Sequence, residues 1–199
     1  MDLINPNVNF SIVLPEMIVA LVGVIVMLYD SFFPKQRKVT GTLSLLGLAV
    51  AAVLLGIMWS ADSGVPATAF GGMVAHDSLR LSFSFVFLLV SALTILISTI
   101  WTDREDVPVG EYHALLMFAT FGMMLMSAGN DLVIIFLGLE TLSIATYVMA
   151  GLRKSDVKSN ESAMKYFILG SLASAFLLYG MALVYGAMGT TNITEIAQD

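Results

Sequence analysis

Six apolar runs of about twenty residues constrain the fold of this chain more than any other feature of the sequence. Each run is long enough to cross the ~30 Å hydrocarbon core of a bilayer as an α-helix. The backbone in hydrocarbon must satisfy its own hydrogen bonds, and the runs lack the alternation of barrel strands, so helices are predicted. The expected spans are roughly residues 10–32, 40–60, 79–101, 111–128, 130–151 and 161–188. We therefore predict an all-α polytopic membrane helix bundle of about six transmembrane helices, with residues 1–199 forming a single transmembrane domain.

The composition excludes several classes of function. Hydrophobic residues make up 58% of the chain and charged residues only 12%, a balance outside the range of soluble globular proteins. The chain has no cysteine, which removes iron–sulfur clusters and thiolate metal sites. His76 and His113 are predicted to lie on opposite sides of the membrane, so no metal site is expected. No basic patch with interleaved aromatic residues is present, so nucleic acid is not expected as a partner.

The distribution of lysine and arginine predicts the orientation. The loops after the first, third and fifth spans hold seven of the nine basic residues: Lys35, Arg37, Lys38, Arg104, Arg153, Lys154 and Lys158. Positive charge marks cytoplasmic loops, so these three loops are expected inside and the N-terminus outside. Residues 61–78, rich in Gly, Pro and Asp, are expected to cross the outer surface as a turn-rich loop.

A carboxylate interrupts the fifth run, DLVIIFLGLETLSIATYVMAG, near its middle. Glu140 lies roughly 15 Å from either end of the span at 1.5 Å per residue, which is too deep for its short side chain to reach the interface. A charge at the bilayer centre costs about 2.5–3.5 kcal/mol on insertion scales. Protonating a glutamate of ordinary pKa, about 4.3, costs roughly 3.7 kcal/mol at pH 7. The two costs are similar, so such a group is suited to receiving and releasing protons.

Helical spacing places Ser143 and Tyr147 on the same face as Glu140. This polar stripe is predicted to turn toward the bundle interior or a hydrated path. The structural alternative is a glutamate that is neutral or hydrogen-bonded between helices and serves only packing.

Lys165 lies about one turn into the sixth span. Its four-carbon stem can lift the ammonium to the cytoplasmic interface, and Glu161 precedes it by four residues, the favourable order for an ion pair. In the functional alternative, the turn between the fifth and sixth spans brings Lys165 close enough to Glu140 for a water-bridged contact. Two other acids receive simpler interpretations: Glu16 marks a helix start beside Pro15, and Asp131 is solvated at a span end.

Three segments of the sequence resemble one family. LPEMIVALVGVIVMLYD (14–30), NDLVIIFLGLETLSIATYVMAG (130–151) and ESAMKYFILGSLASAFLLYGMALVYGAMGTTNI (161–193) resemble subunit N of bacterial proton-translocating NADH:quinone oxidoreductase, respiratory complex I. That subunit is the counterpart of mitochondrial NADH dehydrogenase subunit 2. The resemblance covers nearly the whole chain, and a Glu in the fifth span followed by a Lys early in the sixth is specific in this context.

The resemblance implies an antiporter-like subunit that translocates protons in the bacterial inner membrane. In the family, the residues that match Glu140 and Lys165 are titratable groups of the proton path. NADH, flavin, iron–sulfur clusters and quinone are implied on partner subunits, with no cofactor or metal in this chain. The implied partners are the other membrane subunits of complex I, including neighbouring antiporter-like subunits, and the lipid bilayer.

The chain departs from the family in length. Family members usually have about fourteen spans, including two inverted repeats with broken helices. Six spans cannot supply the later lysines of the family's proton path, so we expect the chain to be the N-terminal portion of a longer protein. Two other interpretations stay open: a subunit of a multi-subunit cation/proton antiporter, and a purely structural membrane subunit.

Overall fold

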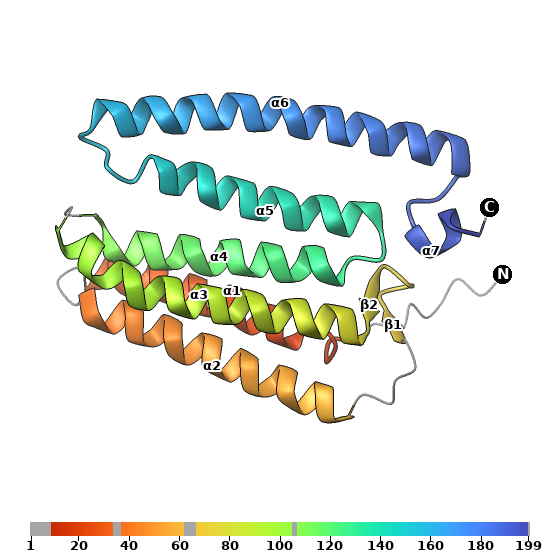
Figure 1. The fold of residues 1–199 in the computed structure, drawn as a ribbon, viewed down its shortest axis with the longest axis horizontal. Coiled ribbons are helices and arrows are strands. Elements are labelled where there is room, and N and C mark those ends of the chain that lie inside the picture. Colours follow the sequence, from red (N-terminus) through yellow and green to blue (C-terminus); the bar gives the residue numbers. More distant parts are fainter. Residues whose placement is uncertain (1–8, 34–36, 62–66, 105–106, 199) are drawn as a thin grey trace.

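The computed structural model describes residues 9–33, 37–61, 67–104 and 107–198. Its elements, in chain order, are α1 (Leu14–Phe32), α2 (Arg37–Ala61), β1 (Ala67–Ala69), β2 (Val74–His76), α3 (Ser78–Arg104), α4 (Val109–Ala128), α5 (Leu132–Ala150), α6 (Val157–Met188) and α7 (Ile193–Ile196) (Figure 1). Within the described residues, six of these helices are long and apolar enough to cross a membrane. The prediction of an all-α membrane helix bundle is therefore confirmed.

The long helices lie side by side in two groups. The first four form a bundle in which α4 packs against α1, α2 and α3. The fifth helix lies on α4, and α6 lies on the outer side of α5 (Figure 1). None of the residues of α6 is buried. The molecule thus consists of a packed four-helix bundle extended on one side by the α5–α6 hairpin.

A hydrophobic core fills the four-helix bundle. Val19 of α1, Leu55 of α2, Leu81 of α3 and Met117 of α4 are all fully buried in one cluster. Because every helix of the bundle contributes to this cluster, the four pack as one unit.

The two groups join where the backbones of α4 and α5 cross closely. A Cβ atom added to Gly122 would lie 2.6 Å from the carbonyl oxygen of Gly138, and one added to Gly138 would lie 2.6 Å from the amide nitrogen of Met126. Small residues at such a crossing let helices in a membrane pack backbone against backbone. The position of α5 therefore depends on these two glycines.

Helix ends differ from the predicted ranges where local signals override the apolar pattern. The first helix begins at Leu14 rather than near residue 10, with Pro15 in its first turn. The sixth begins at Val157 rather than near 161, because the Asp156 side chain accepts a hydrogen bond from the Lys158 amide. The interpretation of Asp131 as a solvated residue is wrong, because its side chain is only 4% exposed. Its carboxylate caps α5 by accepting a hydrogen bond from the Val133 amide, and it accepts another from the Thr191 hydroxyl.

A small antiparallel hairpin, β1–β2, lies within the segment predicted to be a turn-rich crossing. Its turn contains Phe70, Gly71 and Gly72, all with positive φ, and the two glycines adopt that backbone region without a Cβ clash. The side-chain amides of Asn130 and Asn192 both donate to the Gly72 carbonyl. The hairpin thus ties the α4–α5 turn to the segment that follows α6.

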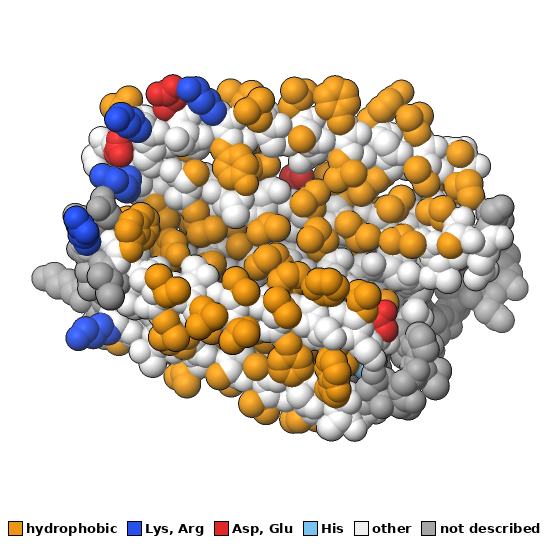
Figure 2. All heavy atoms as spheres, viewed as in Figure 1, with side chains coloured by type: hydrophobic (Ala, Val, Ile, Leu, Met, Phe, Trp, Pro, Cys, Tyr) orange, Lys and Arg blue, Asp and Glu red, His pale blue; other side chains and the backbone are white. Residues whose placement is uncertain are grey.

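Lysine and arginine side chains gather at one end of the molecule, at the left of Figure 2, while hydrophobic side chains cover the flank. The α3–α4 and α5–α6 connections and the start of α2 lie at that end (Figure 1). Lys35, the side chain of Arg37 and residues 1–8 with the N-terminus lie outside what the structure describes. The described basic side chains are distributed as the sequence predicts.

Candidate functional site

Glu140 lies between α5 and α6, near the middle of both helices. Its side chain is half-buried, and Oε1 accepts a hydrogen bond from the hydroxyl of Ser174 on α6. Figure 2 shows that hydrophobic side chains cover much of the surface of α5 and α6. The carboxyl group is thus held by a donor from a neighbouring span at a depth where apolar side chains dominate.

Tyr147 extends the same face of α5 by two turns. Its ring is 8% exposed and packs edge-on against Tyr166, with the centroids 4.7 Å apart. The ring also lies directly over Gly170, where any Cβ would overlap the Tyr147 hydroxyl. Glu140 and Tyr147 therefore both face α6, as their predicted position on one face of the helix requires.

Lys165 lies on a different face of α6 and has another partner. Its Nζ is 2.5 Å from Oε1 of Glu161, and both side chains are mostly exposed. Nine residues separate Lys165 from Ser174, which at 3.6 residues per turn places them about 180° apart around the helix. The structure therefore does not bring Lys165 and Glu140 together; it shows the ion pair with Glu161 that the sequence spacing favoured.

The sequence did not reveal a buried ion pair at the end of the bundle where α1 and α3 begin. Arg80 Nη2 lies 2.6 Å from Glu16 Oε1, and the two side chains are 0% and 1% exposed. The same guanidinium donates to the carbonyl oxygens of Ile12 and Ala75. The interpretation of Glu16 as a helix-start residue is therefore incomplete: it lies in the first turn of α1, but its carboxylate is the buried counter-ion of Arg80. A signal was available, because both residues begin spans that start on the same side.

His113 of α4 is a second buried group whose role the sequence did not reveal. Its side chain is 1% exposed, and Nδ1 lies 3.3 Å from the Thr40 hydroxyl of α2. No group of three or more His, Cys, Asp or Glu side chains in the described ranges could hold a metal ion.

The Glu140 site can hold a proton or a negative charge with little rearrangement. The Ser174 hydroxyl donates to a carboxylate oxygen, and a hydrogen bond to a charged group is stronger than one between neutral groups. A protonated carboxyl can still accept through its other lone pairs. The hydrogen bond from Ser174 is therefore compatible with either protonation state of the carboxyl group.

Comparison with known proteins finds a family model that matches the segment containing this site. A family described as "NADH:quinone oxidoreductase/Mrp antiporter, TM" matches residues 129–199. Both Glu140 and Lys165 lie in the matched segment. The four-helix bundle, which ends at Ala128, lies outside it.

Curated relatives match nearly the whole chain. NADH-quinone oxidoreductase subunit N of Trichlorobacter lovleyi is 41% identical over 96% of this chain and 39% of its own length. Subunit N of Chloroflexus aggregans is 39% identical, again over 96% of this chain and 39% of its own length. Subunit N of Rhodospirillum rubrum is 39% identical over 93% of this chain. The chain thus spans less than half the length of the curated relatives it matches.

Solved structures show the same fold. A chain of respiratory complex I from Thermus thermophilus is 33% identical, with a TM-score of 0.71 over 89% of this chain and 38% of that chain. A chain of an archaeal membrane-bound sulfane sulfur reductase shares the fold at 22% identity, with a TM-score of 0.73. Over nearly its whole length, therefore, the chain is similar to NADH-quinone oxidoreductase subunit N, and it spans less than half of the length of that subunit.

Proposed function

We propose that this chain is part of an antiporter-like membrane subunit that translocates protons in NADH:quinone oxidoreductase, and that Glu140 exchanges protons during translocation. The observation that carries the proposal is a mid-span carboxyl group that receives a hydrogen bond from the neighbouring span. Its position within the matched segment 129–199 supports the same function.

Glu140 would change its protonation state when the charge around it changes. The Ser174 hydroxyl can donate to the carboxyl group with or without its proton, so the site would not have to rearrange. A change in nearby charge would then release or capture a proton. Redox steps in partner subunits would drive that change.

Lys165 is proposed as a second titratable group rather than a direct partner of Glu140. Its side chain is 70% exposed on a helix that has no buried residue, although it stands in a membrane span. An ionisable group in a span normally faces protein or water rather than lipid. The ammonium is therefore proposed to act from the face of α6 opposite Ser174.

The proposed setting is the bacterial inner membrane, with the N-terminus outside and the basic end in the cytoplasm. The gathered lysine and arginine side chains support this orientation. NADH, flavin, iron–sulfur clusters and quinone are proposed to bind partner subunits, and the proposed neighbours are the other membrane subunits of complex I.

The test replaces Glu140 by Gln in the complete complex and measures protons pumped per NADH oxidised. Gln keeps the size and the acceptor for Ser174 but cannot exchange a proton at neutral pH, so the ratio is expected to fall. Glu195→Gln, which removes an exposed carboxylate of α7 outside the membrane spans, is the control and is expected to leave the ratio unchanged. An unchanged ratio in Glu140→Gln would remove Glu140 from the pathway.

A multi-subunit cation/proton antiporter is the second candidate, because the matched family description covers both kinds of protein. The two differ in their driving force. In membrane vesicles, proton uptake that follows NADH addition supports the oxidoreductase, whereas uptake that needs a sodium gradient and ignores NADH supports the antiporter. A purely structural role predicts that Glu140→Gln lowers assembly but leaves pumping per assembled complex normal.

A further inference from the structure

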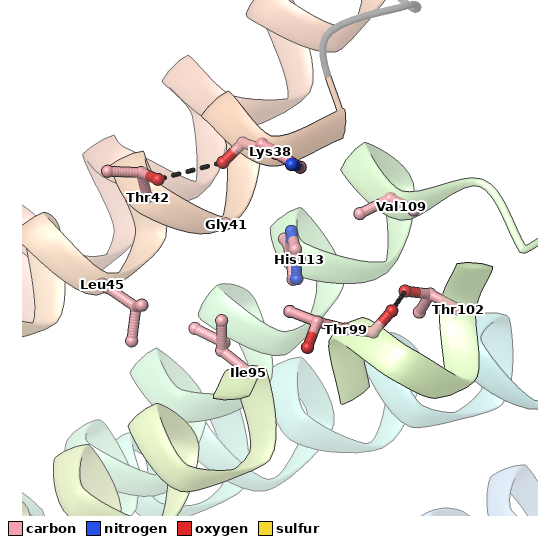
Figure 3. A pocket seen from close by; sticks show the side chains of 9 residues that line it. All are labelled: Lys38, Gly41, Thr42, Leu45, Ile95, Thr99, Thr102, Val109 and His113. Carbon is pink, nitrogen blue, oxygen red and sulfur yellow. Dashed lines mark hydrogen bonds between the residues drawn. The ribbon is translucent and has the colours of Figure 1, made fainter. Parts of the chain in front are cut away.

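A cavity opens between α2, α3 and α4 at the basic end of the four-helix bundle, remote from Glu140 (Figure 3). Its volume is about 350 Å³. Lys38 and Thr42 line it from α2, Thr99 and Thr102 from α3, and His113 from α4. Three helices thus contribute polar side chains to one space.

His113 supplies a buried polar atom without a partner. Nε2 is buried and makes no hydrogen bond within the described part of the chain, although the residue lines the cavity. A buried imidazole nitrogen left unpaired is costly, and most such groups in native structures bind protein, water or a ligand. The cavity is where a partner for Nε2 would sit.

The neighbours of His113 hold its ring in place. A Cβ on Gly41 would lie 3.1 Å from Cε1 of His113, so the glycine leaves room for the ring. When the Thr40 hydroxyl donates to Nδ1, the proton lies on Nε2, which then becomes a donor. In this tautomer the imidazole offers an N–H to an acceptor in the cavity.

The charge of the cavity is positive. Lys38 is exposed, and its ammonium makes no ion pair with the described side chains. No Asp or Glu is among the described residues that line the space. A ligand that neutralises Lys38 and accepts from an N–H must therefore be an anion with oxygen acceptors.

The deeper part of the cavity is apolar. Leu45 and Ile95 line it, and Leu45 lies about 10 Å along α2 from Lys38 at 1.5 Å per residue. Beside it, Leu46 and Leu96 are more than half exposed on the flank. Trp101, 46% exposed near the end of α3, is typical of the depth of lipid headgroups.

From these features we infer that the cavity binds an anionic phospholipid. The phosphate contacts the Lys38 ammonium and the Nε2–H of His113, and an acyl chain follows Leu45 and Ile95 into the groove. Basic pockets between spans on the cytoplasmic side commonly bind such headgroups. The site would fix lipid against the four-helix bundle and does not depend on proton exchange at Glu140.

Native mass spectrometry of the purified full chain in detergent tests the proposal. Phosphatidylglycerol is titrated in, with phosphatidylethanolamine and inorganic phosphate as separate arms. We expect one phosphatidylglycerol to be retained at least tenfold more tightly than phosphatidylethanolamine, with no comparable binding of phosphate. Lys38→Gln is expected to remove the preference, and Lys158→Gln, an exposed lysine at the same end, to preserve it.

Gly41→Ala provides a second variant that keeps both polar side chains. The added methyl group displaces the His113 ring, so retention of phosphatidylglycerol is expected to weaken while Lys38 remains. Equal retention of the two lipids would overturn the proposal, as would an unchanged preference in Lys38→Gln. Phosphate binding as tight as lipid binding would show a simple anion site and overturn it too.

Discussion

The polar groups of the four-helix bundle and of the α5–α6 hairpin have different partners. In the bundle, about half of the residues of α4 are buried. Arg80 and Glu16 form an ion pair inside the protein. In the hairpin no residue of α6 is buried, and Glu140 has a hydroxyl rather than a cation as its partner. The buried carboxylate of Glu16 has a cation beside it, whereas the carboxyl group of Glu140 has a neutral hydroxyl donor.

This difference distinguishes the four-helix bundle from the hairpin that carries the proposed functional group. The segment that the family description matches begins at residue 129, where the bundle ends. The bundle therefore lies beside the matched segment, and the hairpin carries the group that is proposed to titrate.

Loss of the buried ion pair is expected to lower the free energy of unfolding more than any other change considered. Arg80→Met leaves the Glu16 carboxylate buried without its cation, which is expected to destabilise the protein by about 3–5 kcal/mol. Denaturant unfolding in detergent, followed by circular dichroism, measures the change. Adding Glu16→Gln to Arg80→Met is expected to recover part of the loss, and a single variant within about 1 kcal/mol of wild type would contradict a buried pair.

The α4–α5 crossing should show an intermediate effect. Gly138→Ala places a methyl group 2.6 Å from the Met126 amide nitrogen, so the helices must separate, at an expected cost of about 1–3 kcal/mol. Gly180→Ala on α6 is the matched control, because nothing lies within 4 Å of its added Cβ. Alanine has a higher helix propensity than glycine, so Gly180→Ala is expected to be neutral or slightly stabilising. Equal destabilisation by both changes would show that the crossing is not tight.

The exposed ion pair of α6 should matter least for stability. Lys165→Gln breaks only the contact with Glu161, and such surface pairs contribute at most about 1 kcal/mol. The same unfolding measurement on the isolated chain is expected to show little change. A loss comparable to that of Arg80→Met would mean that Lys165 has a buried partner in this chain.

The sequence predicted features that depend on hydrophobic length and helical period. Each apolar run became a helix because hydrocarbon leaves the backbone few alternatives. Glu140 and Tyr147 share a face because they are seven residues apart, two turns of helix. The contact of that face with α6 could also be expected, since Gly170 and Ser174 offer a small-residue surface.

Other features depend on which helices become neighbours, and the sequence does not specify this. Glu16 and Arg80 are 64 residues apart, and only the packing of α1 beside α3 brings them together. Lys165 was weighed as a partner of Glu140 on depth alone, but rotation around α6 turns it away. The β1–β2 hairpin was missed because its strands have only three residues each, although Gly71 and Gly72 signalled a turn.

The central claim is that Glu140 gains and loses a proton during turnover, and infrared difference spectroscopy of the complete complex tests it most directly. Spectra recorded before and after NADH addition should contain a carboxyl C=O band that shifts in deuterium oxide. We expect this band to disappear in Glu140→Gln and to persist in Glu195→Gln, which changes an exposed carboxylate of α7. Identical carboxyl bands in wild type and Glu140→Gln would contradict proton exchange at Glu140.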